Sequence, residues 1–152
     1  MTTEADALLK IVLAASRKGV FRSRPVFKPH RKTLPSELLA LEQKLGIPLP
    51  AELRDWLLAA GYGDIDEVLS FREDWFNALS SGPLEGGVVF AQDDLGNFYA
   101  FDARGRIYFL DRSEPVFGML ASDFSSFLKE LIDRDYKLGD WTDTLETQPC
   151  TW

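Results

Sequence analysis

The strongest constraint on the fold lies in residues 88–119, where strand-like apolar runs are separated by very short connections. Residues 88–91, 98–102 and 106–111 form three such runs, and residues 116–119 predict a fourth. The connections carry Asp, Asn and Gly, which favour tight turns. A parallel pair of strands needs a crossover of about a dozen residues, so strands joined this closely must run antiparallel.

Residues 36–61 predict two helices joined by a stiff corner. Ser36 is the expected N-cap of the first helix, and Gly46 stands where a left-handed residue ends a helix. The proline-rich residues 47–50 interrupt the helical pattern, and Pro50 is expected at the first position of the second helix, which ends at Gly61. Apolar residues of the second helix are spaced to share one face: Leu53, Trp56, Leu57 and Ala60.

Helices are also expected near both ends of the chain. The N-terminal one is indicated by the spacing of Ala5, Leu8, Leu9 and Val12. The C-terminal one, with Ser122 as its N-cap, has an apolar face made of Phe124, Phe127, Leu128 and Leu131. Residues 74–79 predict a further short helix, whereas residues 20–33, with two prolines, predict an irregular connection. The fold class is therefore α+β, with an antiparallel sheet of about four to six strands packed against helices.

The length of 152 residues is typical of one domain, so we expect a single domain over residues 1–152, with its core in residues 34–132. An N-terminal helix and a basic arm occupy residues 1–33. Residues 133–152 form a tail that is expected to dock through Trp141 and Trp152. The single cysteine forms no internal disulfide, and no secretion signal or membrane span is evident, which predicts a cytoplasmic protein without membrane contact.

The charge of the chain is distributed unevenly. Residues 1–35 contain 8 Lys or Arg and 2 Asp or Glu, whereas residues 36–152 contain 9 and 22. The acidic body repels nucleic acid and attracts basic partners. The basic arm, residues 17–32, is interpreted as solvated or folded back onto the acidic body, rather than as a nucleic-acid contact.

The residues that carry enzymatic chemistry are sparse. The single histidine, His30, is expected to have no nearby carboxylate to orient it and is interpreted as a surface residue. Asp93 and Asp94 precede Leu-Gly-Asn and are interpreted as a hairpin turn rather than a cation site. We therefore predict no catalytic residue, no metal, no cofactor and no small-molecule substrate. An enzyme of unrecognised type that uses such acidic pairs with a metal is the less favoured alternative.

Three segments, taken in order, resemble the SUKH superfamily. They are residues 41–58, with Leu-Gly-Ile-Pro-Leu-Pro between two helices, the hairpin at residues 89–102, and the helix entry at residues 120–128. The sequence departs from the family at Ala60-Gly61-Tyr62-Gly63, where an Asn-Gly turn is usual. This family includes yeast cell-wall-assembly regulators and bacterial immunity proteins against toxins, often nucleases. The resemblance implies a non-catalytic α+β domain that binds a protein.

The preferred hypothesis is an immunity protein that binds a basic toxin domain through its acidic body. The expected contacts lie in the least regular segment of the sequence: Asp64, Asp66, Glu67, Glu73, Asp74 and Trp75. Trp75 is included because an aromatic flanked by acids can anchor a partner. The alternative is a regulatory scaffold that binds endogenous proteins without a toxin.

Overall fold

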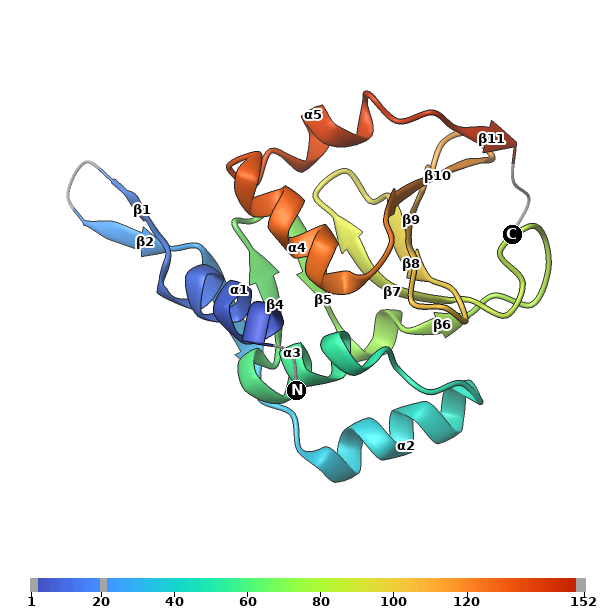
Figure 1. The fold of residues 1–152 in the computed structure, drawn as a ribbon, viewed down its shortest axis with the longest axis horizontal. Coiled ribbons are helices and arrows are strands. Elements are labelled where there is room, and N and C mark those ends of the chain that lie inside the picture. Colours follow the sequence, from blue (N-terminus) through green and yellow to red (C-terminus); the bar gives the residue numbers. More distant parts are fainter. Residues whose placement is uncertain (1–2, 20–21, 150–152) are drawn as a thin grey trace.

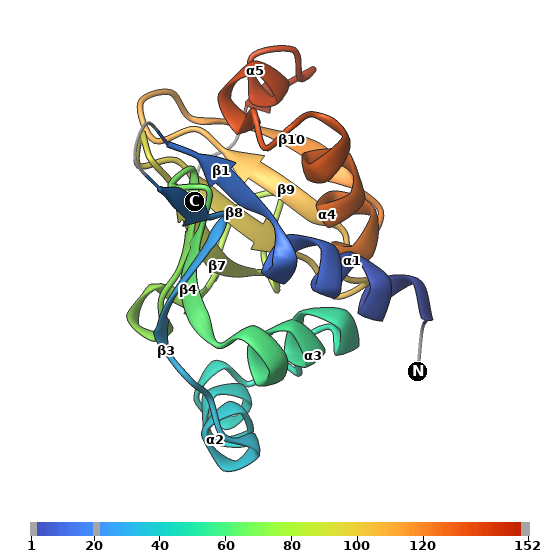
Figure 2. The ribbon, with the colours of Figure 1, turned by 90° about the vertical axis from the view of Figure 1, so that its left-hand side faces the viewer.

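A large antiparallel sheet forms the centre of the fold, with helices packed on one of its faces (Figures 1 and 2). The computed structural model describes residues 3–19 and 22–149. The α+β prediction is confirmed. Within the described residues no helix is long and apolar enough to cross a membrane.

The main sheet has the strand order β11-β10-β9-β8-β7-β5-β4-β3, and every pair is antiparallel. A further short strand, β6 (Asn77–Ala78), also pairs with β7. The path consists of β3 (Phe27–Arg31), β4 (Tyr62–Ile65), β5 (Leu69–Phe71), β7 (Val88–Asp93), β8 (Phe98–Phe101), β9 (Ile107–Leu110), β10 (Val116–Ala121) and β11 (Gln148–Pro149). The four strands predicted between residues 88 and 119 are all present as β7 to β10, and short strands at both sides extend the sheet beyond the four to six expected.

Two of the local predictions are wrong. Residues 20–33 are not an irregular connection, because β2 (Ser23–Pro25) pairs with β1 (Ser16–Lys18) and β3 pairs with β4. Pro29 is tolerated in β3 because this strand lies at the edge of the sheet. Residues 74–79 are not a helix beyond the short 3₁₀ turn η1 (Glu73–Trp75), since pairing with β7 draws the following residues into β6.

Five helices occur in the described residues: α1 (Thr3–Ala14), α2 (Pro35–Leu45), α3 (Ala51–Ala60), α4 (Phe124–Asp133) and α5 (Leu138–Thr142). The predicted corner between α2 and α3 is confirmed, with Gly46 at φ 73° ending α2. The expected caps are displaced by one or two residues. Leu34 rather than Ser36 precedes α2, Pro50 occupies the cap position of α3, and Asp123 rather than Ser122 caps α4 by accepting the Ser126 N–H.

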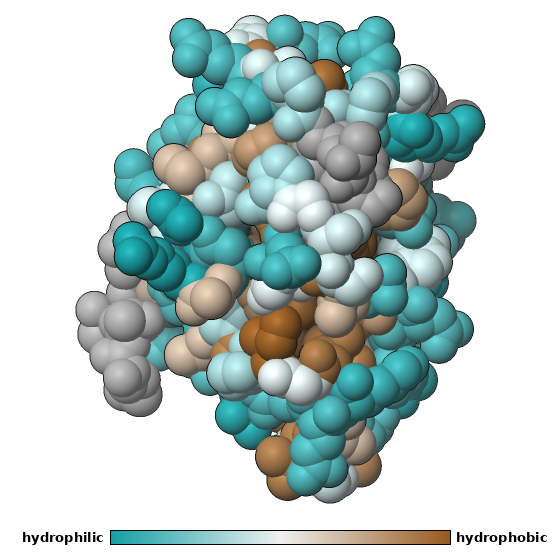
Figure 3. All heavy atoms as spheres, turned by 90° about the vertical axis from the view of Figure 1, so that its right-hand side faces the viewer, coloured by the Kyte–Doolittle hydropathy of each residue, from teal (hydrophilic) through white to brown (hydrophobic). Residues whose placement is uncertain are grey.

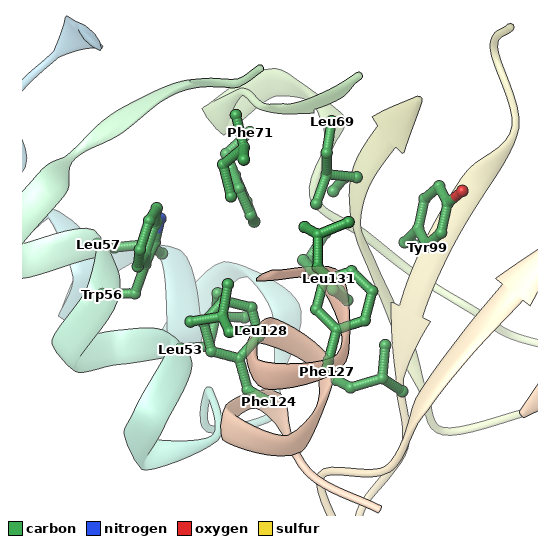
Figure 4. Packing of buried hydrophobic residues seen from close by; sticks show 14 of the residues in the cluster. Leu53, Trp56, Leu57, Leu69, Phe71, Tyr99, Phe124, Phe127, Leu128 and Leu131 are labelled. Carbon is green, nitrogen blue, oxygen red and sulfur yellow. The ribbon is translucent and has the colours of Figure 1, made fainter. Parts of the chain in front are cut away.

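The core is a continuous aromatic cluster between the sheet and the helices. Trp56 on α3, Phe71 on β5 and Phe124 on α4 point toward one another (Figure 4), with ring centroids 6.0–6.4 Å apart. Trp141 extends the cluster by stacking on Phe127 at 5.6 Å, so docking of the tail is confirmed for this residue. Trp152 lies outside the described residues.

The other face of the sheet carries a second, smaller apolar cluster, so side chains cover parts of both faces. Leu79 and Leu84, from the segment between β6 and β7, pack over Val89, Ala100 and Leu110. Figure 3 shows the side of the molecule at the right of Figure 1 as largely hydrophilic, with a small hydrophobic area above the carboxyl end of α2. The covering segment therefore leaves only limited apolar surface there.

The Asp93 carboxylate organises the turn between β7 and β8. One of its oxygens accepts the backbone N–H groups of Leu95 and Asn97 at 3.0 and 2.9 Å, and the other accepts the Tyr99 hydroxyl at 2.8 Å. Asp102 repeats the arrangement at the next turn. The interpretation of Asp93 as a turn residue is therefore confirmed.

Candidate protein-binding surface

The six residues predicted to contact a partner lie on the β3 side of the sheet, with Asp66 and Glu67 at one end of the β4–β5 pair and η1 at the other. Asp64 is on β4, Asp66 and Glu67 form the turn between β4 and β5, and η1 holds the remaining three. The strand pairing of β3, β4 and β5 brings these positions together with the basic arm, which runs through β1, β2 and β3.

The turn that carries Asp66 and Glu67 has an unusual backbone. Both residues are left-handed, with φ 47° and 61°, and the Val68 N–H donates to the Ile65 carbonyl at 2.9 Å. A turn whose two central residues both have positive φ favours Asn-Gly, because L-residues with a Cβ resist this conformation. The acids are thus kept at a position where glycine or asparagine would fit the backbone better.

Arg17 on β1 binds this turn through a two-pronged ion pair. Its Nε and Nη2 donate to the two carboxylate oxygens of Asp66 at 3.2 and 2.8 Å. Nη1 reaches the Asp135 carboxylate at 2.8 Å, Nη2 also reaches the Asp135 carbonyl at 2.9 Å, and the guanidinium lies 5.6 Å from the Tyr136 ring. The hydrogen bonds to Asp66 and Asp135 raise the pKa of Arg17 further above its ordinary value.

Arg24 on β2 adds a weaker contact to the same turn, 3.2 Å from Glu67 and 3.6 Å from Asp66. The β1–β2 hairpin projects from the left of Figure 1. Its residues Arg17 and Arg24 contact the acidic turn. The interpretation of the basic arm as folded back is confirmed for these residues.

Asp64 lies in a second cluster, together with His30 on the neighbouring strand β3. The Nε2 atom of His30 is 2.9 Å from Asp64 Oδ2, and Arg72 Nη2 is 3.6 Å from the other, buried oxygen. The expectation that no carboxylate orients His30 is wrong, because strand pairing places Asp64 beside it. Arg72 also stacks over the Trp75 ring at 5.4 Å, so Trp75 is half-buried under a cation rather than freely exposed.

A third cluster centres on Arg31, at the end of β3. Its guanidinium bridges Glu37 on α2 and Glu73 in η1 and lies 5.2 Å from the Tyr62 ring. The hydrogen bond from Arg31 holds the pKa of Glu37 below its ordinary value, while burial raises the pKa of Tyr62 to about 12. Asp74 is exposed, and the contacts of the described residues give it no ion pair.

Sequence reasoning missed the residues that complete these clusters. Two of them, Asp135 and Tyr136, lie more than 100 residues along the chain from Arg17, which they contact. Glu37 is close to Arg31 in the chain but lies in α2, whose sequence pattern is ordinary. The one signal available was the basic arm itself, whose charge had to be balanced somewhere. The four predicted acids that are ion-paired each contact a basic residue of that arm: Asp64, Asp66, Glu67 and Glu73.

The fold and this surface together define an α+β domain with a charge-paired face at the end of its sheet. In residues 3–19 and 22–149 no group of three or more His, Cys, Asp or Glu is placed to hold a metal ion. The model of the SMI1 / KNR4 family (SUKH-1) matches residues 32–130, and the chain belongs to this family. Comparisons with curated proteins and with solved structures gave no match.

The matched segment leaves the two ends of the chain outside the family domain. It begins at Lys32, after α1, the β1–β2 hairpin and β3, and it ends within α4. The arginines that cover the acidic surface therefore come from an N-terminal extension. The acids Asp64, Asp66, Glu67 and Glu73 belong to the family domain.

Proposed function

We propose that this chain is a non-catalytic protein-binding domain of the immunity type, which binds a basic toxin in the cytoplasm and blocks it. Membership of the SUKH-1 family supports a binding role. The charge of the body points to the partner, because residues 36–152 hold 22 acidic and 9 basic residues. A nuclease toxin presents a basic cleft to its substrate, so an acidic protein can occupy that cleft with fast association.

The observation that carries the proposal is that three of the predicted acids are paired with arginines. Asp66, Glu67 and Glu73 already hold guanidinium groups of the chain itself, at an exposed end of the sheet. Carboxylates arranged to hold guanidinium groups can exchange one arginine for another. Asp74, beside them, is exposed and available to a partner.

A regulatory scaffold for endogenous proteins is the second candidate. It is favoured by the same ion pairs, since an acidic surface balanced by its own arginines has less need of a strongly basic partner. The two functions differ in the partner: a toxin is a single basic protein, and its complex weakens steeply with added salt.

The test is affinity capture by the full chain from its native host, with salt titrated during washing and captured proteins identified by mass spectrometry. A single basic, toxin-like protein released at high salt supports the immunity role. Several endogenous proteins without a toxin support the scaffold. With the partner in hand, the combined variant Asp64→Asn, Glu67→Gln and Asp74→Asn is expected to slow association and flatten its salt dependence.

The matched control removes three exposed acids elsewhere: Asp55→Asn, Glu85→Gln and Glu114→Gln. Both variants change the net charge equally, so long-range attraction falls by a similar amount in each. An equal loss of affinity in the two variants would show that the surface around β4 and η1 is not the binding surface.

A further inference from the structure

The environment of Arg17 has the composition of a binding site for a guanidinium group. Asp66 meets it with both carboxylate oxygens, Asp135 adds a carboxylate and a backbone carbonyl, and the Tyr136 ring lies 5.6 Å away. These groups match the planar, forked hydrogen-bond donors of a guanidinium group and its affinity for aromatic faces. A lysine in the same place could not form the two-pronged pair.

The backbone around this guanidinium is strained on both sides. In the described part of the chain, the non-glycine residues with positive φ are Asp66, Glu67, Asp135 and Tyr136, with values between 47° and 62°. Three of these four residues contact Arg17. Strained backbone of this kind persists where surrounding contacts hold it, and it gathers at binding sites.

The site is open to an incoming side chain. A hollow of about 600 Å³ adjoins it, and its lining includes Arg17, Asp66, Asp135 and Tyr136 together with Asp94, Leu95, Lys137 and Asp140. The Arg17 side chain is 33% exposed. Leu95 is 68% exposed at the tip of the β7–β8 hairpin, where it offers an apolar contact at the rim. Beyond the residues around Arg17, the lining holds two carboxylates, Asp94 and Asp140, and one ammonium, Lys137, so its charge favours a cationic side chain.

The segment that brings Arg17 to the site is weakly anchored. Both strands of the hairpin have three residues, and five of their six side chains are exposed. The hairpin itself buries little apolar surface. Its base is fixed by the Val26 N–H, which donates to the Ala15 carbonyl at 3.0 Å, and Arg17 and Arg24 attach the strands to the acidic turn. It also lies outside the family domain, which supplies Asp66.

We propose that Asp66, Asp135 and Tyr136 form an arginine-recognition site, that Arg17 occupies it in the free protein, and that an arginine of the protein partner displaces Arg17. This inference rests on the proposed binding function and names both the chemistry of the contact and its regulation. The N-terminal extension then sets the affinity that a partner needs, because the partner must present an arginine that displaces Arg17 from the site.

The test uses the full chain with Arg17→Gln, which vacates the site, and N-acetyl-arginine amide as the probe. Titration followed by backbone amide NMR is expected to show at least ten-fold tighter binding to R17Q than to the unmodified chain. The amides that shift are those of Asp66, Glu67, Asp135 and Tyr136. N-acetyl-lysine amide is expected to bind R17Q at least ten-fold more weakly than the arginine probe does.

Arg106→Gln is the matched control, because it removes the same charge and frees the Asp102 carboxylate at a hairpin turn that lacks a second acid. No gain in binding is expected there. Adding Asp66→Asn to R17Q is expected to abolish the gain. If R17Q is folded and binds the probe no more tightly than R106Q, the proposal is wrong.

Should R17Q fail to fold, Arg17→Lys replaces it, because lysine keeps the positive charge and lacks the planar guanidinium. It must then bind the arginine probe more tightly than R106Q does. The probe is not the partner, so the two proposals fail separately. An arginine site without any captured toxin would overturn the immunity role alone. A captured toxin whose affinity is unchanged by R17Q and by Asp66→Asn would overturn the displacement of Arg17.

Discussion

Two regions of the molecule, the aromatic core and the β3 edge of the sheet, are held by different forces. Where α4 meets the strands, Phe124 packs against Trp56, Phe71 and Phe90 with ring centroids 6.2–6.4 Å away. Where the N-terminal extension meets β4 and η1, the contacts are mainly guanidinium–carboxylate pairs on exposed or half-exposed side chains. The first kind of contact is insensitive to salt and pH, whereas the second responds to both. Stability therefore resides mainly in the aromatic core, whereas the arginine contacts beside β3 and β4, the charged end of the sheet, respond to salt and pH.

Phe124→Ala is expected to have the largest effect, because it removes a fully buried ring that packs against four other aromatic residues. The free energy of unfolding should fall by about 3–5 kcal/mol. Urea denaturation followed by tryptophan fluorescence measures it. Leu95→Ala, at an exposed position, is the control and should change stability by less than about 0.5 kcal/mol. A loss below about 1 kcal/mol for Phe124→Ala would contradict the division between core and charged end.

Gly63→Ala tests whether the charged end also contains a packing constraint. An added Cβ would lie 2.4 Å from the Lys28 carbonyl oxygen and 2.7 Å from the Phe27 ring, so β3 would have to move away from β4. We expect a loss of about 1–3 kcal/mol and faster amide exchange in β3.

Gly139→Ala is the control for this substitution, since a Cβ there meets no atom within 4 Å and the residue lies in α5. Hydrogen exchange and urea denaturation measure both variants. Equal stability of the two would show that β3 is free to shift on the sheet.

Asp102→Asn sharpens the comparison by removing a carboxylate at the turn between two core strands. Burial by itself raises the pKa of Asp102. Hydrogen bonds from the Arg106 side chain and from the backbone amides of Arg104 and Arg106 lower it by more than burial raises it, so the pKa lies below its ordinary value. The ionised carboxylate therefore contributes stability above about pH 4 that is lost as the pH falls through the folded-state pKa.

At pH 7 this variant is expected to lose about 1–3 kcal/mol. The gap between the two proteins should narrow below about pH 4, as shown by urea denaturation at several pH values. Asp55→Asn, at an exposed position on α3, should follow the unmodified chain throughout. A gap that stays constant with pH would mean that ionisation of Asp102 is irrelevant.

Glu67→Gly is expected to have the smallest effect and the opposite sign. Glycine accepts φ 61° without the Cβ clash, and the lost contact to Arg24 is an exposed one. We expect the free energy of unfolding to rise by about 0.5–1 kcal/mol. Thermal denaturation measures this change, and Glu85→Gly, at an exposed residue without positive φ, is the control. A clear loss of stability would show that the Arg24 pair outweighs the strain.

Local patterns in the sequence predicted the elements that depend on local chemistry. The strands β7 to β10, the corner at Gly46 and the turn at Asp93 were all evident, because each is encoded by residues close together in the chain. Strand β3 was missed since four of its five residues are exposed, which leaves no alternation to detect.

The charged end was predicted only in part, for a different reason. Acidic residues at positions 64–74 were singled out, but their partners depend on how strands pair. Arg17 lies 49 residues from Asp66 and 118 from Asp135, and only tertiary structure brings the three together. Composition could indicate that the arm and the body attract each other, yet it could not indicate which acid meets which arginine.

Strand β3 also affects how the molecule behaves among its own copies. It ends the sheet, and an open sheet edge is a template on which a second chain can add a strand. Pro29 offers no N–H to such a strand, the register shifts between Pro29 and Arg31, and Lys28 places a charge on the same edge. Each of these features discourages edge-to-edge association. The edge is thereby protected against aggregation even when the hairpin beside it is displaced.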